Sequence, residues 1–249
     1  MGYIQSNKYE ENPDNVANEL SKYYKMLFSV KQTQAEARQH IINRLRNKAI
    51  SKRSAQTMDR IIEDEEVEKI MAQLTLGKQP GPNRVPNAVF RCLSSVFAPK
   101  LAQVLRDAVG GAPLPPSMME GDICVLHKKK ARTDVRNYRP ITLLNSDYKV
   151  YTKVLANRVK EVVHQFVSEA QKGFVPDVFI AECSMTLNLI EAWINEEPED
   201  REGLFLFLDM EKAFDRVSYK YLNDAMEALA FGPNFRRAVG LMYDEASPP

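Results

Sequence analysis

Hydrophobic residues recur every three or four positions over most of the first 110 residues, and this spacing is typical of amphipathic helices. Asn12 before Pro13 marks the start of the first helix, and Thr33 with Glu36 forms a capping box at the start of the second. The pattern predicts five helices, over about residues 13–27, 34–46, 67–74, 86–93 and 97–109.

The third of these helices is followed by a break in the pattern. Gly77 ends the helix, and Pro80 and Pro82 cannot continue it because each lacks a backbone donor and has a fixed φ. We therefore expect an N-terminal helical arm at residues 1–64 and a second domain at residues 65–249.

Strand-like patterns begin after residue 121. The short apolar run 123–126 leads into a basic loop, and residues 141–144 are its expected antiparallel partner. Leu204–Leu208 is a five-residue apolar run followed by Asp209, which is the pattern of a central strand buried on both faces. Further helices are expected over about residues 146–166, 179–194, 219–230 and 235–243.

The charge total conceals two zones of opposite sign. Lys and Arg number 34 against 33 Asp and Glu, so the net charge of +1 gives no reason to propose a nucleic-acid partner. Residues 121–160, however, hold ten cations and three acids, a net of +7, whereas residues 191–215 hold nine acids and two cations, a net of −7. The basic zone favours phosphate binding, and a solvated charged face is the alternative.

Asp209 is the first candidate for metal binding. A carboxylate at the carboxyl end of a buried strand lies at a sheet rim, where a hard divalent cation can be held. Asp215 is a possible second ligand six residues later. The alternative is that Asp209 is a turn or capping residue, and the spacing alone leaves both open.

The other reactive side chains form no recognisable motif. His40, His127 and His164 share no metal-ligand spacing, and neither a P-loop nor a G-x-S-x-G segment is present. Trp193 is expected in the core. We expect buried thiols in a reducing compartment for the three well-separated cysteines, Cys92, Cys124 and Cys183.

The apolar stretches are short. None approaches the roughly 18 residues of a membrane span, and the first ten residues lack the apolar region of a signal peptide. An intracellular protein without a membrane partner is therefore expected.

Six segments of the chain match, in order, six short sequence patterns. They are residues 77–83 (G-K-x-P-G-x-D), 121–129 (G-x-I-x-x-L-x-K-K), 137–149 (N-Y-R-P-I-S-L-L-N-x-D-Y-K), 155–158 (L-A-N-R), 171–176 (Q-x-G-F-V-P) and 207–217 (F-L-D-x-E-K-A-F-D-x-V). Together they resemble the reverse transcriptase domain of non-LTR (LINE-type) retrotransposons. The resemblance covers about residues 65–245, and the last segment matches almost throughout. The family has Asp-Gly where this chain has Asn83–Arg84, and Gly-Arg where it has Asp177–Val178.

The resemblance implies an α/β (α+β) right-hand polymerase fold, with the fingers and the first part of the palm, mostly helical with a small antiparallel sheet. It also implies an RNA-directed DNA polymerase that uses two Mg²⁺ ions, an RNA template, a DNA primer and deoxynucleoside triphosphates. Asp209 matches the first catalytic, metal-binding palm residue. Phe214 matches the aromatic residue that favours deoxynucleotides, and Asp215 matches a supporting Asp. The fingers residues that face the triphosphate and the template match Lys128, Lys129, Lys130 and Arg139.

The second palm motif of this family, Y-x-D-D, does not occur in the 249 residues. We therefore expect that this chain alone is catalytically inactive, because the carboxylate pair that completes the metal site is missing. Two alternatives stay open: a non-enzymatic RNA-binding remnant that uses the basic zone, and an unexpressed or unstable retroelement relic. The resemblance further implies a nuclear location, although no clear targeting signal is present.

Overall fold

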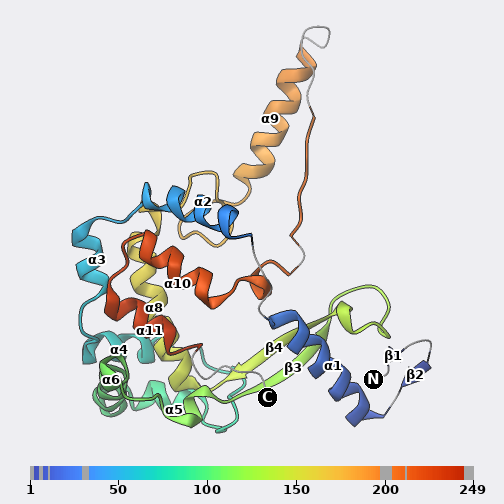
Figure 1. Cartoon of the computed structure of the whole chain (residues 1–249). Coiled ribbons are helices and arrows are strands. Elements are labelled where there is room, and N and C mark those ends of the chain that lie inside the picture. Colours follow the sequence, from blue (N-terminus) through green and yellow to red (C-terminus); the bar gives the residue numbers. More distant parts are fainter. Residues whose placement is uncertain are drawn as a thin grey trace.

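A computed structural model of the chain describes residues 3–5, 8–10, 12–29, 34–196, 204–210 and 212–243 (Figure 1). Helices account for most of these residues, and the strands form two antiparallel pairs. The expectation of a mostly helical fold with a small antiparallel sheet is therefore confirmed. Within these ranges, no helix combines the length and the apolar character needed to span a membrane.

The elements follow one another as alternating helical and hairpin segments. The first half contains β1 (Tyr3–Gln5), β2 (Lys8–Glu10), α1 (Pro13–Phe28), α2 (Ala35–Arg46), α3 (Lys52–Met58), α4 (Asp64–Ala72), α5 (Asn87–Cys92), α6 (Ser94–Gly110) and α7 (Pro116–Met119). The second half contains β3 (Gly121–His127), the 3₁₀ turn η1 (Val135–Asn137), β4 (Tyr138–Leu144), α8 (Ser146–Val162), η2 (Val163–Gln165), α9 (Glu182–Glu196), η3 (Phe214–Arg216), α10 (Tyr219–Ala228) and α11 (Pro233–Gly240).

Local sequence explains where several helices begin. The Asn12 side chain accepts a hydrogen bond from the Asp14 amide at 3.0 Å, and Pro13 occupies the first helical position of α1, as predicted. α2 begins after Gln34, whose side chain makes no capping hydrogen bond. The capping box predicted at Thr33 lies outside the described residues.

The predicted antiparallel hairpin is confirmed and is longer than expected. β3 pairs with β4 from Gly121 opposite Leu144 to His127 opposite Tyr138. The basic loop therefore lies at one end of a seven-residue ladder, and the start of α8 lies at the other end (Figure 1).

The hydrophobic core lies where α4 packs on α6 and α8, with α11 against α6 and α8. Met71, Leu105 and Tyr151 are fully buried there, and the Tyr151 hydroxyl donates a hydrogen bond to the Ala238 carbonyl. Met58, from the N-terminal part of the chain, belongs to the same core. The core thus crosses the predicted division between residues 64 and 65, and that division stays a prediction.

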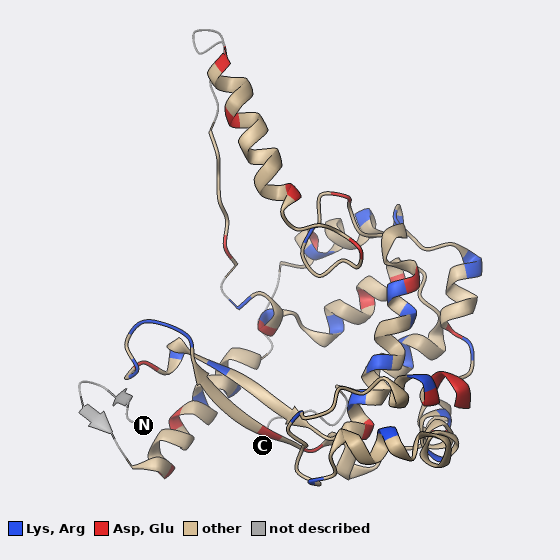
Figure 2. Cartoon of the chain, turned by 180° about the vertical axis from the view of Figure 1, so that it is seen from behind, with Lys and Arg blue, Asp and Glu red and all other residues tan. Residues whose placement is uncertain are grey.

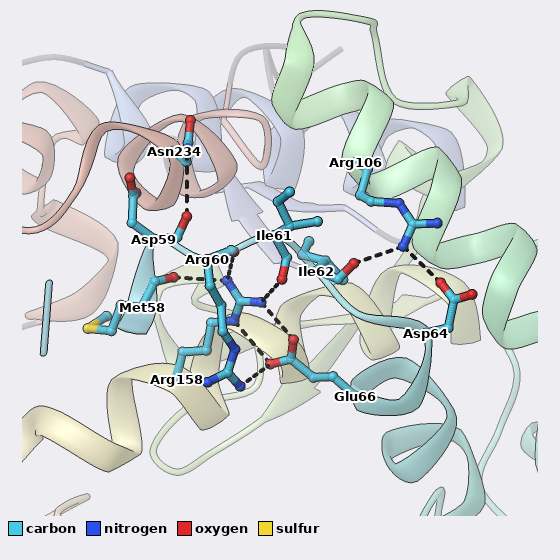
Figure 3. Close-up of polar contacts among 10 residues, drawn as sticks. All are labelled: Met58, Asp59, Arg60, Ile61, Ile62, Asp64, Glu66, Arg106, Arg158 and Asn234. Atoms are coloured by element: carbon cyan, nitrogen blue, oxygen red, sulfur yellow. Dashed lines mark hydrogen bonds and ion pairs between the residues drawn. The ribbon is translucent and has the colours of Figure 1, made fainter. Parts of the chain in front are cut away.

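A buried arginine fixes the chain that leads from α3 to α4 (Figure 3). Arg158 is only 4% exposed, and its Nη1 donates to the carbonyls of Met58 and Arg60 at 2.9 and 2.7 Å. Its Nη2 donates to the Ile61 carbonyl at 3.2 Å. A bidentate pair with Glu66, at 3.0 and 2.6 Å, completes the set. The last carbonyls of a helix lack intrahelical partners, so this arginine of the L-A-N-R segment supplies donors that α3 cannot supply itself.

The prediction of a buried central strand at Leu204–Leu208 is wrong. Residues 204–210 are extended without strand pairing, and their large side chains are exposed, with Leu206 at 76%. This segment projects away from the helical body, as α9 does (Figure 1). A central strand is stabilised by ladder hydrogen bonds on both edges, and no strand among the described residues pairs with this one.

The predictions of a core Trp193 and of buried cysteines are also wrong. Trp193 is 55% exposed, and it lies with Cys183 on α9, none of whose residues is buried. Cys92, at the end of α5, and Cys124, on β3, are exposed as well. Apolar spacing on a helix predicts which face is available for burial, and whether another element covers that face depends on the tertiary arrangement.

Candidate functional site

The basic loop at residues 128–137 forms the tip of the β3–β4 hairpin (Figure 2). The Lys128 amide donates to the Asn137 carbonyl at 2.9 Å, which closes the loop. Lys130 has a left-handed φ of 68°, and its carbonyl lies 3.1 Å from His127 Nε2. Lys128, Lys129 and Lys130 are exposed, so three adjacent ammonium groups are presented on a loop that its own backbone closes.

One arginine of the loop is neutralised within it. Arg136 Nε and Nη2 donate to Asp134 at 3.0 and 2.8 Å, and these bonds lower the pKa of that carboxyl group. No such ion pair is found, within the described ranges, for Lys128 to Lys130 or for Arg139 on β4. The uncompensated charge of the hairpin therefore includes all four predicted phosphate-binding residues.

Tyr138 connects the tip to the first helix. It is buried, its hydroxyl donates to the Arg132 carbonyl at 2.8 Å, and its ring packs edge-on against His127 at 5.4 Å. Its own carbonyl accepts a hydrogen bond from the Tyr24 hydroxyl of α1 at 3.0 Å. One residue at the start of β4 thus ties the basic tip to α1.

The remaining predicted site residues lie in residues 204–210 and 212–217, which we call the palm segment. Asp209 is exposed at the end of the extended segment 204–210. Phe214, in η3, is 80% exposed, and its ring packs edge-on against Phe174 with centroids 5.7 Å apart. Asp215, also in η3, is half-buried.

α1 also contacts this palm segment, through Lys212. The Lys212 ammonium lies 4.5 Å from the centroid of the Tyr23 ring and 5.2 Å from that of Tyr24. In the part of the chain that is described, this buried nitrogen has no hydrogen-bond acceptor, so the two rings are its main electrostatic support. Burial, followed by the charges of Tyr23 and Asp215, raises the pKa of Tyr24 to about 12. Tyr24 therefore contacts both predicted parts of the site.

The residues present do not form a complete metal site. No group of three or more His, Cys, Asp or Glu side chains in the described ranges is arranged to hold a metal ion. Asp209 thus belongs to no such group among the described residues. The roles predicted for Asp209, Asp215 and Phe214 stay predictions.

Sequence reasoning missed the contacts that join these parts. Tyr23 and Tyr24 lie in the helix predicted over about residues 13–27, and Lys212 lies in the matching segment 207–217, but neither pattern predicts a contact between them. The available signal was a pair of adjacent aromatic residues on one helix, which indicates a ring surface large enough to receive a cation.

Comparison with known proteins identifies the class. Residues 126–244 match the family model for reverse transcriptase (RNA-dependent DNA polymerase). Over 239 residues the chain is 28% identical to the transposon TX1 uncharacterized 149 kDa protein of Xenopus laevis, and the match covers 95% of this chain and 18% of that protein. It is 31% identical over 158 residues to the RNA-directed DNA polymerase from mobile element jockey of Drosophila melanogaster, covering 61% and 17%.

A third relative is the Pol polyprotein from the type-1 retrotransposable element R2 of Nasonia vitripennis, 23% identical over 158 residues, covering 63% of this chain and 14% of that protein. The chain spans less than a fifth of the length of these relatives. Residues 126–244 therefore belong to the reverse transcriptase family. Their relatives are transposon proteins, which confirms the resemblance to the LINE-type group, and members of the family generally use a divalent metal.

Proposed function

We propose that this chain is the fingers and first palm segment of an RNA-directed DNA polymerase of a LINE-type element. The observation that carries the proposal is the double contact of Tyr24, which links the basic hairpin tip through Tyr138 and the palm segment through Lys212. A helix that holds both parts gives them a fixed relation, as positioning of a template and a nucleotide requires.

The side chains have separate tasks in this proposal. Lys128, Lys129, Lys130 and Arg139 bind the phosphates of the template and of the incoming nucleotide through charge and hydrogen bonds. Phe214, whose ring is 80% exposed, would contact the sugar and favour a deoxyribose. Asp209 contributes a ligand for Mg²⁺ and Asp215 supports it. Because the described residues hold no companion ligands, the 249 residues alone are proposed to be inactive.

Nucleic-acid binding by the full chain tests the role of the tip. Fluorescence anisotropy with an RNA template annealed to a DNA primer should show affinity that falls steeply with salt. The Lys128→Gln/Lys129→Gln/Lys130→Gln variant should lower the slope of log K against log salt by about 2 to 3. The control variant Lys52→Gln/Lys100→Gln/Lys220→Gln removes the same charge from exposed positions on α3, α6 and α10. Equal loss in both variants, or binding that ignores salt, contradicts the proposal.

Primer extension with Mg²⁺ tests the proposed inactivity. The 249-residue chain should extend no primer on an RNA template. Template-dependent DNA synthesis that Asp209→Asn abolishes would show that the chain carries a working site by itself.

The second candidate is a non-enzymatic RNA-binding protein. It is favoured by the exposure of residues 204–210, because a polymerase palm would hold this segment as a covered strand. Nucleotide discrimination separates the two. The polymerase proposal expects tighter binding of a deoxynucleoside triphosphate than of its ribonucleotide counterpart, and loss of that preference in Phe214→Ala. The RNA-binding candidate expects no preference in either protein. A nuclear location, for which a reporter fusion is the test, is part of the polymerase proposal.

A further inference from the structure

A second basic surface lies at the end of the β3–β4 hairpin remote from the tip. There, residues from α4, α5, the end of β4 and the first turns of α8 line a groove of about 730 Å³. Three lysines line it, Lys78, Lys149 and Lys153, and no acidic residue does. None of the three has an ion-pair partner among the residues that the structure describes. The groove is therefore an uncompensated site of positive charge.

The loop that carries Lys78 is held closely against the start of α8. A Cβ at Gly81 would lie 2.4 Å from Asn145 Oδ1, so only glycine allows this approach. The same Oδ1 accepts a hydrogen bond from the Asn83 amide at 3.1 Å. Lys149 and Lys153 follow on successive turns of α8, which places them on the same helix face. The three lysines thus converge through backbone packing between two segments far apart in the sequence.

The rest of the groove combines apolar and polar surface. Ile70, Leu74 and Leu143 provide the apolar part, and Gln73 and Thr142 are among its polar residues. The polar residues at the wall by α5 are already paired: Asn87 donates to the Thr75 carbonyl at 2.8 Å and accepts from the Ser146 hydroxyl at 2.7 Å. The surface left for a ligand therefore combines the apolar residues with Gln73 and Thr142, and it lies beside three cations. A ligand that presents an anionic group next to a flat apolar ring matches it.

We propose that this groove binds a nucleotide unit, with its phosphate on Lys78, Lys149 and Lys153 and its base against Leu74 and Leu143. Along β4, the rise from Tyr138 at the tip to Leu143 at the groove is about 17 Å. The tip and the groove therefore contact different nucleotides of one RNA strand. The choice of RNA rests on the proposed function, whereas the affinity for a nucleotide unit rests on the groove alone.

The first experiment measures salt-dependent binding of the full chain to a fluorescein-labelled single-stranded oligouridylate of about 12 nucleotides. Lys78→Gln/Lys149→Gln/Lys153→Gln should lower the slope of log K against log salt by about 2, because each neutralised phosphate of a single strand contributes roughly 0.7 to that slope. The control Lys52→Gln/Lys100→Gln/Lys220→Gln should leave the slope nearly unchanged. Because Lys149 is half-buried, Lys78→Gln/Lys153→Gln serves as a second variant, with an expected reduction of about 1.4.

The second experiment locates the base. Oligouridylate containing 4-thiouridine should photo-crosslink to peptides from residues 70–79 or 142–153, and the crosslinks should disappear in the groove variant. Uridine monophosphate tests the free nucleotide as a source of the same chemistry: it should compete for these crosslinks and bind in equilibrium dialysis.

The outcomes separate this inference from the proposed function. An unchanged slope in the groove variant, or an equal change in the control, contradicts nucleotide binding by the groove. Neither result affects the role proposed for the hairpin tip. If the wild-type chain binds no RNA, the proposed function fails, and uridine monophosphate alone decides whether the groove binds nucleotides. Competition by polyglutamate as strong as by oligouridylate overturns the assignment to a nucleotide in favour of an acidic polypeptide.

Discussion

The helical body and the projecting palm segment differ in how far they bury apolar side chains and in the hydrogen bonds they give to cationic ones. In the body, the buried Arg158 guanidinium is surrounded by hydrogen-bond acceptors, and apolar residues such as Leu105 are fully covered. In the segment 204–210, apolar residues are exposed, and the neighbouring Lys212 ammonium lies over the Tyr23 ring without a hydrogen-bond acceptor among the described residues. The difference shows that the body is stabilised by its own contacts, whereas the palm segment contributes little to stability and is available for other contacts.

The largest expected effect is that of breaking the buried network. Arg158→Ala leaves Glu66 and several carbonyls without donors, and we expect a loss of about 3 to 5 kcal/mol in the free energy of unfolding. Arg106 is the matched control, because it donates to the Ile62 carbonyl at 2.9 Å and to Asp64 at 2.8 Å but is partly exposed (Figure 3). Arg106→Ala should cost about 1 kcal/mol or less. Urea unfolding measures both, and equal losses would remove the distinction between buried and exposed pairs.

Truncation of leucines compares the two regions directly. Leu105→Ala opens a cavity in the core of the body, and we expect a loss of about 2 to 5 kcal/mol. Leu206→Ala removes an exposed side chain and should change the free energy of unfolding by less than about 0.5 kcal/mol. A large cost at Leu206 in the same urea experiment would mean that the palm segment is covered in solution.

Tyr24 tests the link between the two predicted parts of the site. Tyr24→Phe removes its hydrogen bond to the Tyr138 carbonyl and keeps the ring, so we expect a loss of about 1 kcal/mol near neutral pH. Tyr23→Phe is the control, because the structure gives its hydroxyl no such bond to the described part of the hairpin, and the loss there should be close to zero. An equal loss in both variants would mean that the effect does not come from the hydrogen bond between the Tyr24 hydroxyl and the Tyr138 carbonyl.

A pH dependence at the same residue is a separate test, because it needs alkaline conditions. The pKa of Tyr24 is raised from 10.0 to about 12, so between these values the folded chain keeps a proton that the unfolded chain has lost. Its contribution is fully present below about pH 10 and is lost as the pH rises through about 12. The stability advantage of wild type over Tyr24→Phe should therefore shrink over this range. Unfolding midpoints of the two proteins at each pH measure it, and a constant difference contradicts the raised pKa.

Local sequence patterns were sufficient to predict those helices and strands whose determining contacts are close in sequence. The start of α1 at Asn12–Pro13 followed from capping, and the β3–β4 hairpin followed from two apolar runs around a basic loop. The helix over residues 182–196 was also predicted, because helical spacing is a local property. The short helices α3 and α7 were missed, since seven and four residues carry too little periodic signal.

Local sequence patterns gave wrong predictions of burial where a second element decides whether a side chain is covered. The apolar run at Leu204–Leu208 predicted a strand buried on both faces, but burial requires pairing and covering elements that the run does not itself specify. The predictions that Trp193 and the cysteines are buried were wrong for the same reason. For the candidate site, the motifs named the residues, and the bridging role of Tyr24 depended on contacts across more than a hundred residues of sequence.

The sequence by itself determined the match of residues 126–244 to the reverse transcriptase family, the order of the motifs and the two zones of opposite charge, because these are properties of residue identity along the chain. Only the tertiary structure decided that Lys78 joins Lys149 and Lys153 in one groove, and that Arg158 completes the end of α3. The physical reason is that charge and hydrogen-bonding capacity belong to single residues, whereas burial and convergence depend on which distant segments pack together.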